Sequence, residues 1–174
     1  MKYIQFETNR LILRPTVESD ADFILELLNS PKWIEFIGDR NVRSEDEAIR
    51  YIEQKMLPQL KKLGFGNYTI VRKEDNVKLG CCGLYDRPGL DGIDIGYALL
   101  PKFEGKGYAF EAAHCIKEAA FEVLGLRLIR AITSKRNKES QKLLTKLGFN
   151  FVELTTIPDD SEELMLYELS ISEI

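Results

Sequence analysis

The segment that most constrains this chain is a short glycine-containing stretch, residues 102–107, which joins two strongly patterned regions. It reads Lys-Phe-Glu-Gly-Lys-Gly. Residues 93–100 are short and apolar, as in a strand, whereas residues 108–124 repeat their alanines and larger apolar side chains at helical spacing. A helix begins with unpaired N–H groups and the positive end of its dipole, so glycines there let a phosphate group approach the backbone closely. The stretch therefore predicts a site for an anionic, phosphate-bearing cofactor.

Neither common nucleotide-binding motif fits this stretch. A P-loop needs G-x-x-x-x-G-K-[ST], and neither Gly105 nor Gly107 begins that spacing. A dinucleotide fingerprint needs G-x-G-x-x-G, but Phe110 stands where a small residue should allow close packing of the helix on the strand. A nucleotide-binding protein is thus the weaker interpretation, which tighter binding of ATP or NAD than of coenzyme A would support.

Four segments of the chain resemble one enzyme family. Residues 102–107 resemble motif A of the GNAT superfamily of acetyl-CoA-dependent N-acetyltransferases, [QR]-x-x-G-x-[GA], with Lys102 in place of the usual Gln or Arg. The other segments are similar to the ribosomal-protein alanine N-acetyltransferase (Rim-type) branch: E-T-N-R-L-I-L-R-P at 7–15, D-I-G-Y at 94–97, and N-K-E-S followed by K-L-G-F within 137–149. The matches follow the order and spacing of that branch.

The resemblance implies a mixed α/β fold of three layers, α/β/α, around a splayed and mostly antiparallel central sheet. In this family the pantetheine arm of coenzyme A passes between two strands that part near the middle of the sheet. A length of 174 residues suits one domain, so we expect residues 1–174 to form a single N-acetyltransferase domain.

Local patterns predict the order of elements. The expected strands are 4–14, 67–72, 79–85, 92–100, 127–133, 151–156 and 164–169, with 67–72 and 79–85 forming a hairpin. The expected helices are 22–28, 44–63 with a kink or junction at Pro58, 108–124 and 138–147. Thr16 or Ser19 is expected to cap the first helix, and Ser44 with Glu47 to form a capping box on the second. Residues 33–43 are expected to be irregular, and the resemblance implies that they form a wall of the acceptor site.

Charge and composition argue against several classes of binding partner. The net charge is −4, the pI is about 5.2 and no long basic run occurs, which argues against a nucleic-acid surface. Apolar runs are far shorter than the roughly 20 residues that span a bilayer, so we expect a cytoplasmic protein without membrane contact, monomeric or homodimeric. His114 and the three cysteines lack the spacing of metal ligands, so we expect no metal site and structural roles for these residues.

Acetyl transfer from a thioester to an amine needs a neutral amine, a polarised carbonyl and a proton for the departing thiolate. By the resemblance, Asp94 stands where many family members hold a glutamate that takes the amine proton, and its shorter side chain favours a bridging water. Ser140 would donate a proton to the thiolate, and the backbone at Leu99 or Leu100, freed by a bulge, would polarise the carbonyl. From local sequence alone, Asp94 can equally be a strand-face carboxylate and Ser140 an exposed helix residue.

The remaining candidate residues follow the same resemblance. Those expected to bind the coenzyme around the glycine loop are Lys102, Glu104, Gly105, Lys106, Gly107, Tyr108 and Ala109. Those expected near its pantetheine arm and thioester are Leu99, Leu100, Asn137 and Ser140. Asn137 or Ser134 can also simply cap the fourth helix. The aromatic residues expected to bind the acceptor are Trp33, Phe36, Tyr85 and Tyr97.

The sequence therefore predicts an N-acetyltransferase that moves acetyl directly from acetyl-CoA to a primary amine, with a protein N-terminal α-amine favoured by the branch. A small-molecule amine is the alternative acceptor. A non-catalytic sensor that binds acyl-CoA is the alternative from another class, and it stays open because Asp94 replaces Glu and Lys102 replaces Gln or Arg.

Overall fold

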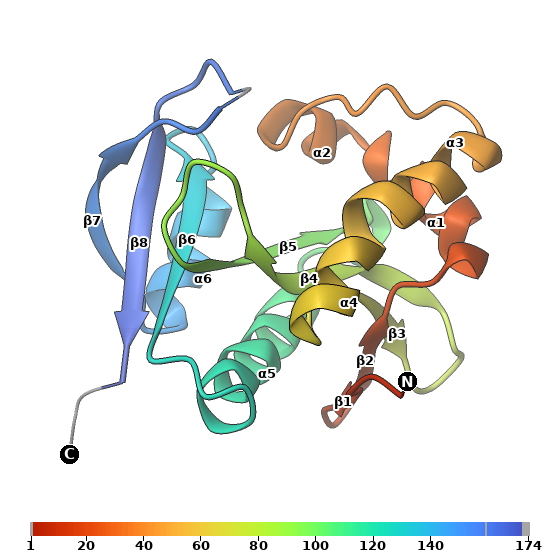
Figure 1. Ribbon diagram of the computed structural model, residues 1–174, viewed down its shortest axis with the longest axis horizontal. Helices are drawn as coiled ribbons and strands as arrows, with labels where there is room; N and C mark the ends of the chain where they lie inside the picture. Colours follow the sequence, from red (N-terminus) through yellow and green to blue (C-terminus); the bar gives the residue numbers. More distant parts are fainter. Residues whose placement is uncertain (1, 159, 172–174) are drawn as a thin grey trace.

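The computed structural model describes residues 2–158 and 160–171, and its centre is one eight-stranded sheet (Figure 1). The strands are β1 (Phe6–Glu7), β2 (Leu11–Pro15), β3 (Asn67–Arg72), β4 (Lys78–Asp86), β5 (Ile93–Leu99), β6 (Leu128–Ser134), β7 (Asn150–Thr155) and β8 (Leu164–Ser170). Their order in the sheet is β1-β2-β3-β4-β5-β6-β8-β7, and every neighbouring pair is antiparallel except β5 with β6.

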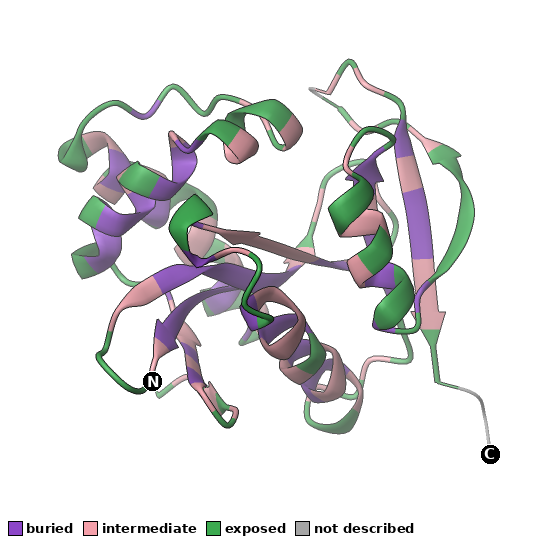
Figure 2. Ribbon diagram, turned by 180° about the vertical axis from the view of Figure 1, so that it is seen from behind, coloured by how far each residue is buried: buried purple, intermediate pink, exposed green. Residues whose placement is uncertain are grey.

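Helices cover both faces of the sheet. They are α1 (Ala21–Leu28), α2 (Pro31–Phe36), α3 (Glu45–Tyr51), α4 (Leu57–Leu63), α5 (Tyr108–Glu122) and α6 (Lys138–Lys146). The helices α1 to α4 lie on one side, and α5 and α6 lie on the other (Figures 1 and 2). This confirms the expected three-layer fold with a mostly antiparallel sheet. Within the part of the chain that the structure describes, no helix combines the length and apolar character needed to cross a membrane.

The helix α5 packs tightly on the sheet because its inner face is built from small side chains. Ala112, Ala113, Ile116 and Ala120 have no exposed surface, and Figure 2 shows the buried side of this helix against the strands. Alanine combines the highest helix propensity with the smallest side chain, so the helix axis can approach the sheet closely. The beginning of α5 is thereby held at a fixed position beside the end of β5.

Two local predictions on the second helical region are confirmed. The Ser44 hydroxyl accepts a hydrogen bond from the Glu47 N–H at 3.2 Å, and the Glu47 carboxylate accepts one from the Ser44 N–H at 3.1 Å, which is a capping box. The predicted junction near Pro58 is also present, because α3 continues into a π-helical turn at Ile52–Met56 before α4 begins. Proline fits there because the first turn of a helix needs no N–H from it.

Three expectations for the N-terminal region are wrong. The single strand 4–14 is instead a hairpin of β1 and β2, in which Phe6 lies opposite Leu13. Neither Thr16 nor Ser19 caps α1, because a 3₁₀ turn at Glu18–Asp20 precedes that helix. Residues 33–43 are not wholly irregular, since α2 begins at Pro31, where proline is again tolerated as a helix start.

Asp20 is the buried charge of this region, with no exposed surface. The two terminal nitrogens of Arg14 bind its carboxylate oxygens at 2.7 and 2.8 Å, Lys78 binds it at 2.9 Å, and the N–H of Val17 donates to it at 3.1 Å. A buried carboxylate is costly unless it is paired and hydrogen-bonded, and these contacts satisfy both of its oxygens. Asp20 therefore ties β2, β4 and the start of α1 together.

A chain of buried polar side chains runs from Asp20 toward the middle of the sheet. The Thr69 hydroxyl donates to Asp20 at 3.2 Å and lies 2.8 Å from the Thr16 hydroxyl. The Asn67 amide donates to Thr16 at 2.8 Å, and its oxygen accepts from the Tyr85 hydroxyl at 2.6 Å. Because a carboxylate only accepts, the hydroxyls can all donate in the direction of Asp20. The hydroxyl of Tyr85 is thereby fixed in place.

Candidate active site

The central strands β5 and β6 touch at one residue pair and then separate. Asp94 pairs with Arg130, and no other pairing joins these two strands in the described residues. The N–H of Leu100 donates to a β4 carbonyl at 2.8 Å. Because backbone groups point alternately to the two sides of a strand, the N–H groups of Tyr97 and Leu99 point away from β4, into the space that β6 has left.

The expected bulge at Leu99 or Leu100 is wrong. β5 pairs with β4 in continuous register, from Ile93 opposite Asp86 to Leu99 opposite Gly80. Register shifts lie instead between β3 and β4, beside Ile70, and between β7 and β8, beside Phe151. A bulge is unnecessary because the departure of β6 already leaves alternate N–H groups of β5 without a strand partner. The N–H of Leu100 is not among them, since it bonds to β4.

The glycine loop follows β5 through a short 3₁₀ turn at Pro101–Phe103. Gly105 and Gly107 have φ values of 71° and 81°, in the left-handed region that favours glycine. A Cβ on Gly105 would meet no atom within 4 Å, so glycine is required there for its backbone and not for space. Gly107 is the N-cap residue of α5, and the loop therefore brings exposed backbone to a helix start.

The charged side chains of the loop are engaged with neighbouring helices. Lys102 lies 3.5 Å from Glu26 of α1. Glu104 binds the ammonium of Lys32 at 2.7 Å, and the same ammonium binds Glu139 of α6 at 2.8 Å. These hydrogen bonds, from Glu104 first and then Glu139, raise the pKa of Lys32. Lys32 thus joins the glycine loop to the start of α6. These two segments lie on either side of the space between the parting strands β5 and β6, which we call the gap.

The start of α5 offers a ligand its backbone more than its side chains. Tyr108 is buried, with its ring 4.3 Å from the Arg10 guanidinium and its hydroxyl accepting from Arg72 at 3.3 Å. Ala109 is half-buried and Lys106 is exposed. Of the predicted coenzyme contacts at this helix start, the N–H groups are therefore the ones available.

Asp94 lies at the point where the strands part and is 1% exposed. The Nε of Arg87 donates to its two oxygens at 3.1 and 3.3 Å, and Nη2 donates at 3.2 Å. Burial raises the pKa of Asp94, and the Arg87 charge and its hydrogen bonds oppose that rise. The carboxylate is therefore a buried group with one cationic partner, and sequence reasoning did not identify that partner.

Tyr97 and Ser140 come together across the gap. Their hydroxyls lie 3.0 Å apart, and the Tyr97 hydroxyl also donates to the Ser140 carbonyl at 3.3 Å. Asn137 caps α6, because its side-chain oxygen accepts from the Ser140 N–H at 3.2 Å. Ser134 instead bonds Glu162 through its hydroxyl. The amide nitrogen of Asn137 keeps its donors directed away from this cap.

Tyr85 lies flat on the face of the sheet that α1 to α4 cover. A Cβ on Gly96 would come within 3.0 Å of its ring, and a Cβ on Gly83 would come within 2.9 Å of its hydroxyl. These two glycines are paired across β4 and β5 and form a seat for the ring. The Arg87 guanidinium lies 5.5 Å from the ring centre. Tyr85, Arg87 and Asp94 thus form one cluster beside the gap.

Trp33 and Phe36 lie on α2, which is tied across the gap by charged side chains. Lys32 binds Glu104 and Glu139, as described above. The Arg136 Nη1 lies 3.4 Å from the Glu35 carboxylate, and the Arg136 guanidinium carbon lies 5.7 Å from the centre of the Phe36 ring. The Trp33 Nε1 is buried and has no hydrogen-bond partner among the residues that the structure describes. Figure 1 shows α2 above the space between β6 and the first helices.

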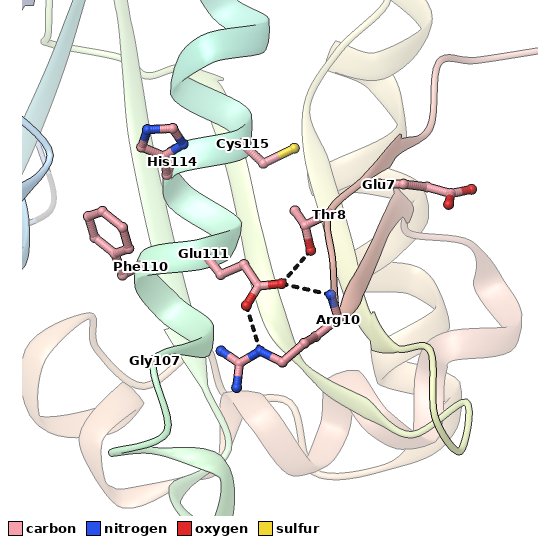
Figure 3. Close-up of a pocket in the computed structure, with 8 residues that line it drawn as sticks. All are labelled: Glu7, Thr8, Arg10, Gly107, Phe110, Glu111, His114 and Cys115. Carbon is pink, nitrogen blue, oxygen red and sulfur yellow. Dashed lines mark hydrogen bonds and ion pairs between the residues drawn. The ribbon is translucent and has the colours of Figure 1, made fainter.

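Other chemically active side chains lie apart from the gap. Burial raises the pKa of the Cys81 thiol to about 12 and also raises that of Cys82, so neither is a ready nucleophile. No three His, Cys, Asp or Glu residues gather into a metal-binding group in the described part of the chain. A cavity of about 520 Å³ lies between the β1–β2 turn and α5 (Figure 3). It is lined by Glu7, Thr8, Arg10, Gly107, Phe110, Glu111, His114 and Cys115.

Comparison with known proteins gives consistent results. The model of the acetyltransferase (GNAT) domain matches residues 10–150. The uncharacterized N-acetyltransferase p20 of Bacillus licheniformis is 31% identical over 144 residues, which cover 82% of this chain and 80% of that protein. An acetyltransferase from Agrobacterium tumefaciens superposes with a TM-score of 0.82 at 24% identity, covering 98% and 96% of the two chains. RimL, a ribosomal L7/L12 α-N-protein acetyltransferase in complex with coenzyme A, gives a TM-score of 0.80 at 17% identity, with coverage of 97% and 98%.

Proposed function

Because this chain belongs to the acetyltransferase (GNAT) family and is an N-acetyltransferase, we propose that it transfers acetyl directly from acetyl-CoA to a protein N-terminal α-amine. The observation that carries this proposal is the single residue pairing between β5 and β6 in the described part of the chain, with the glycine loop at the end of β5. The pantetheine arm would pass where the two strands part, and the pyrophosphate would bind at the helix start. We also propose that residues 1–174 act as one domain in the cytoplasm.

The coenzyme would be held mainly by backbone groups. The N–H groups at Gly105 to Ala109 suit the pyrophosphate, since they combine left-handed glycines with the positive end of a 15-residue helix. The Asn137 amide nitrogen would donate to a pantetheine carbonyl. The N–H of Leu99, which points into the gap, would polarise the acetyl carbonyl. Acetyl-CoA supplies the activated acyl group.

Deprotonation of the amine is the more demanding step. At pH 7, an α-amine with a pKa of about 8 is about one-tenth neutral, whereas a lysine with a pKa of about 10.4 is neutral in only about 4 of 10,000 molecules. We assign Asp94 as the base, acting through water, because burial raises its pKa and so makes it a better proton acceptor. Arg87 would hold the carboxylate in one orientation.

We propose that the acetyl group passes directly to the amine, without a covalent acyl-enzyme intermediate. The amine nitrogen attacks the acetyl carbonyl carbon, the new C–N bond forms and the C–S bond breaks. The amine proton goes to Asp94, and Ser140 would donate a proton to the thiolate. Tyr97 lies 3.0 Å from the Ser140 hydroxyl and can return that proton to it. The aromatic groups of Trp33, Phe36 and Tyr85 would line the acceptor side.

One observation favours a second candidate function. The carboxylate at the position of the family's base is ion-paired with Arg87, which suits an acyl-CoA sensor that binds without turnover. A thiol-release assay with acetyl-CoA separates the candidates, using peptides with free N-termini, the same peptides blocked at the N-terminus, polyamines and free amino acids. We expect release with free N-termini only. Thiol release with polyamines or amino acids alone would show that the acceptor is a small-molecule amine and not a protein N-terminus. No thiol release despite coenzyme binding would favour the sensor.

A further inference from the structure

Arg10, in the turn between β1 and β2, makes more contacts with the start of α5 than any sequence pattern suggested (Figure 3). Its Nε binds the Glu111 carboxylate at 2.6 Å, and its backbone N–H donates to the other oxygen of that carboxylate at 2.9 Å. The Thr8 hydroxyl donates to the same carboxylate at 2.6 Å. Glu111 thereby locks Arg10 in one conformation against the first turn of the helix.

The locked guanidinium then reaches the glycine loop. Its Nη1 donates to the carbonyl of Lys106 at 3.0 Å, and its central carbon, Cζ, lies 4.3 Å from the centre of the Tyr108 ring. The carbonyl of Lys106 and the N–H of Gly107 belong to one peptide unit, and no cis peptide bond is present in the described chain. In a trans peptide unit the C=O and N–H point in opposite directions.

We propose that Arg10 is a positioning residue for the coenzyme: it holds the Lys106 carbonyl toward the β1–β2 turn and so directs the Gly107 N–H away from that turn, toward the pyrophosphate. The gap between β5 and β6 lies on that other side of α5 (Figure 1). This inference rests on the proposed binding of acetyl-CoA, and it adds a residue outside the glycine loop to the coenzyme site.

The arrangement requires arginine specifically. The Nε and Nη1 of one planar guanidinium serve two partners in different directions, Glu111 and the Lys106 carbonyl, while a lysine ammonium is a single point on a flexible stem. Partial burial raises the pKa of Glu111, but the hydrogen bonds from Thr8 and Arg10 outweigh it and lower that pKa. The carboxylate is thus charged throughout the neutral range and holds the guanidinium at any pH at which the enzyme would work.

The test measures the binding of coenzyme A, which carries the pyrophosphate, and the reaction with acetyl-pantetheine, which does not, in wild type and in matched variants. Calorimetry with coenzyme A should show affinity about tenfold weaker in Arg10→Gln, the loss of roughly one oriented hydrogen bond to a charged group. Arg10→Lys should not restore it. Glu111→Gln should reproduce much of the loss, and the double variant should be no weaker than Arg10→Gln, because both changes break one unit. With acetyl-pantetheine as donor, which lacks the pyrophosphate, kcat/KM should be equal in all variants.

Arg14→Gln is the control, since it removes an equally well-paired arginine from the adjoining strand without touching the loop. Both arginine variants should melt at lower temperature, but only Arg10→Gln should lose coenzyme affinity. Equal coenzyme affinity in Arg10→Gln and wild type, or an equal loss with acetyl-pantetheine, would overturn the inference. If wild type itself binds no coenzyme A, the proposed function fails and not merely the role of Arg10.

Discussion

Protonation of Asp20 is expected to remove a measurable part of the stability of this fold in acid. Burial alone would raise its pKa, but the contacts of Arg14, the Val17 N–H and Lys78 outweigh it and lower the pKa from 3.8 to about 2. Because the folded chain releases this proton more readily than the unfolded chain, the carboxylate stabilises the fold above the unfolded pKa. That stabilisation is lost as pH falls toward the folded pKa.

The size of the effect follows from these two values. At about 1.36 kcal/mol for each pKa unit, the full contribution is about 2.4 kcal/mol near neutral pH. The same linkage relation gives a loss of about 1.6 kcal/mol by about pH 2.5. Asp20 has no exposed surface, so solvent screening does not reduce this figure as it would for a surface pair.

Urea unfolding of wild type and Asp20→Asn at about pH 6.5 and about pH 2.5 measures this contribution. We expect the difference in unfolding free energy between the two proteins to shrink by about 1.6 kcal/mol at the lower pH. Asp75→Asn is the control, because Asp75 also pairs with an arginine, Arg72, but its side chain is 40% exposed. Parallel pH dependence in Asp20→Asn and wild type would refute the reasoning, and so would an equal change in Asp75→Asn.

Three further predictions concern the proposed site. Gly107→Val should weaken coenzyme A binding at least tenfold by calorimetry, about 1.4 kcal/mol, whereas Gly125→Ala, at a left-handed position beyond the far end of α5, should not. Ser140→Ala should lower turnover by up to about 10²-fold with acetyl-CoA affinity unchanged, and lost affinity with intact turnover would make Ser140 a binding residue. Asp94→Asn should show its largest loss of rate relative to wild type near neutral pH, and for an α-amine acceptor that loss should disappear near about pH 8. If the pH–rate profiles of the variant and wild type run parallel, Asp94 is not the base.

Much of the fold could be predicted because its signals are local. The capping box of Ser44 and Glu47 and the junction near Pro58 depend on residues a few positions apart, and both are present. The glycine loop was expected between a strand and a helix, and it does lie between β5 and α5, with Gly107 as the N-cap residue. The turn at Thr8–Arg10 contains neither glycine nor proline, the strongest local markers of a turn, so no clear signal separates β1 from β2.

The partners of the site residues could not be predicted, because they depend on register between distant segments. The contact of Arg10 with Glu111 joins residues 101 positions apart, one in the segment 7–15 and the other in the helix that follows the glycine loop. Arg87 follows β4 just before a proline–glycine turn and carries no local signal for an ion pair. Only the pairing of β4 with β5 brings it to Asp94.

The alternation of side chains along β5 gives the proposed chemistry its direction. Asp94 and Gly96 share the face on which Tyr85 lies, since a Cβ on Gly96 would come within 3.0 Å of that ring. Tyr97 is three positions from Asp94, so its side chain lies on the opposite face, where it meets Ser140 of α6. A base on one face and a proton donor for the thiolate on the other suit direct transfer, because the attacking amine and the departing thiolate occupy different positions around the tetrahedral acetyl carbon. A shift of β5 by one residue would place both groups on the wrong faces, so the continuous β4–β5 register matters as much to this proposal as the side chains themselves.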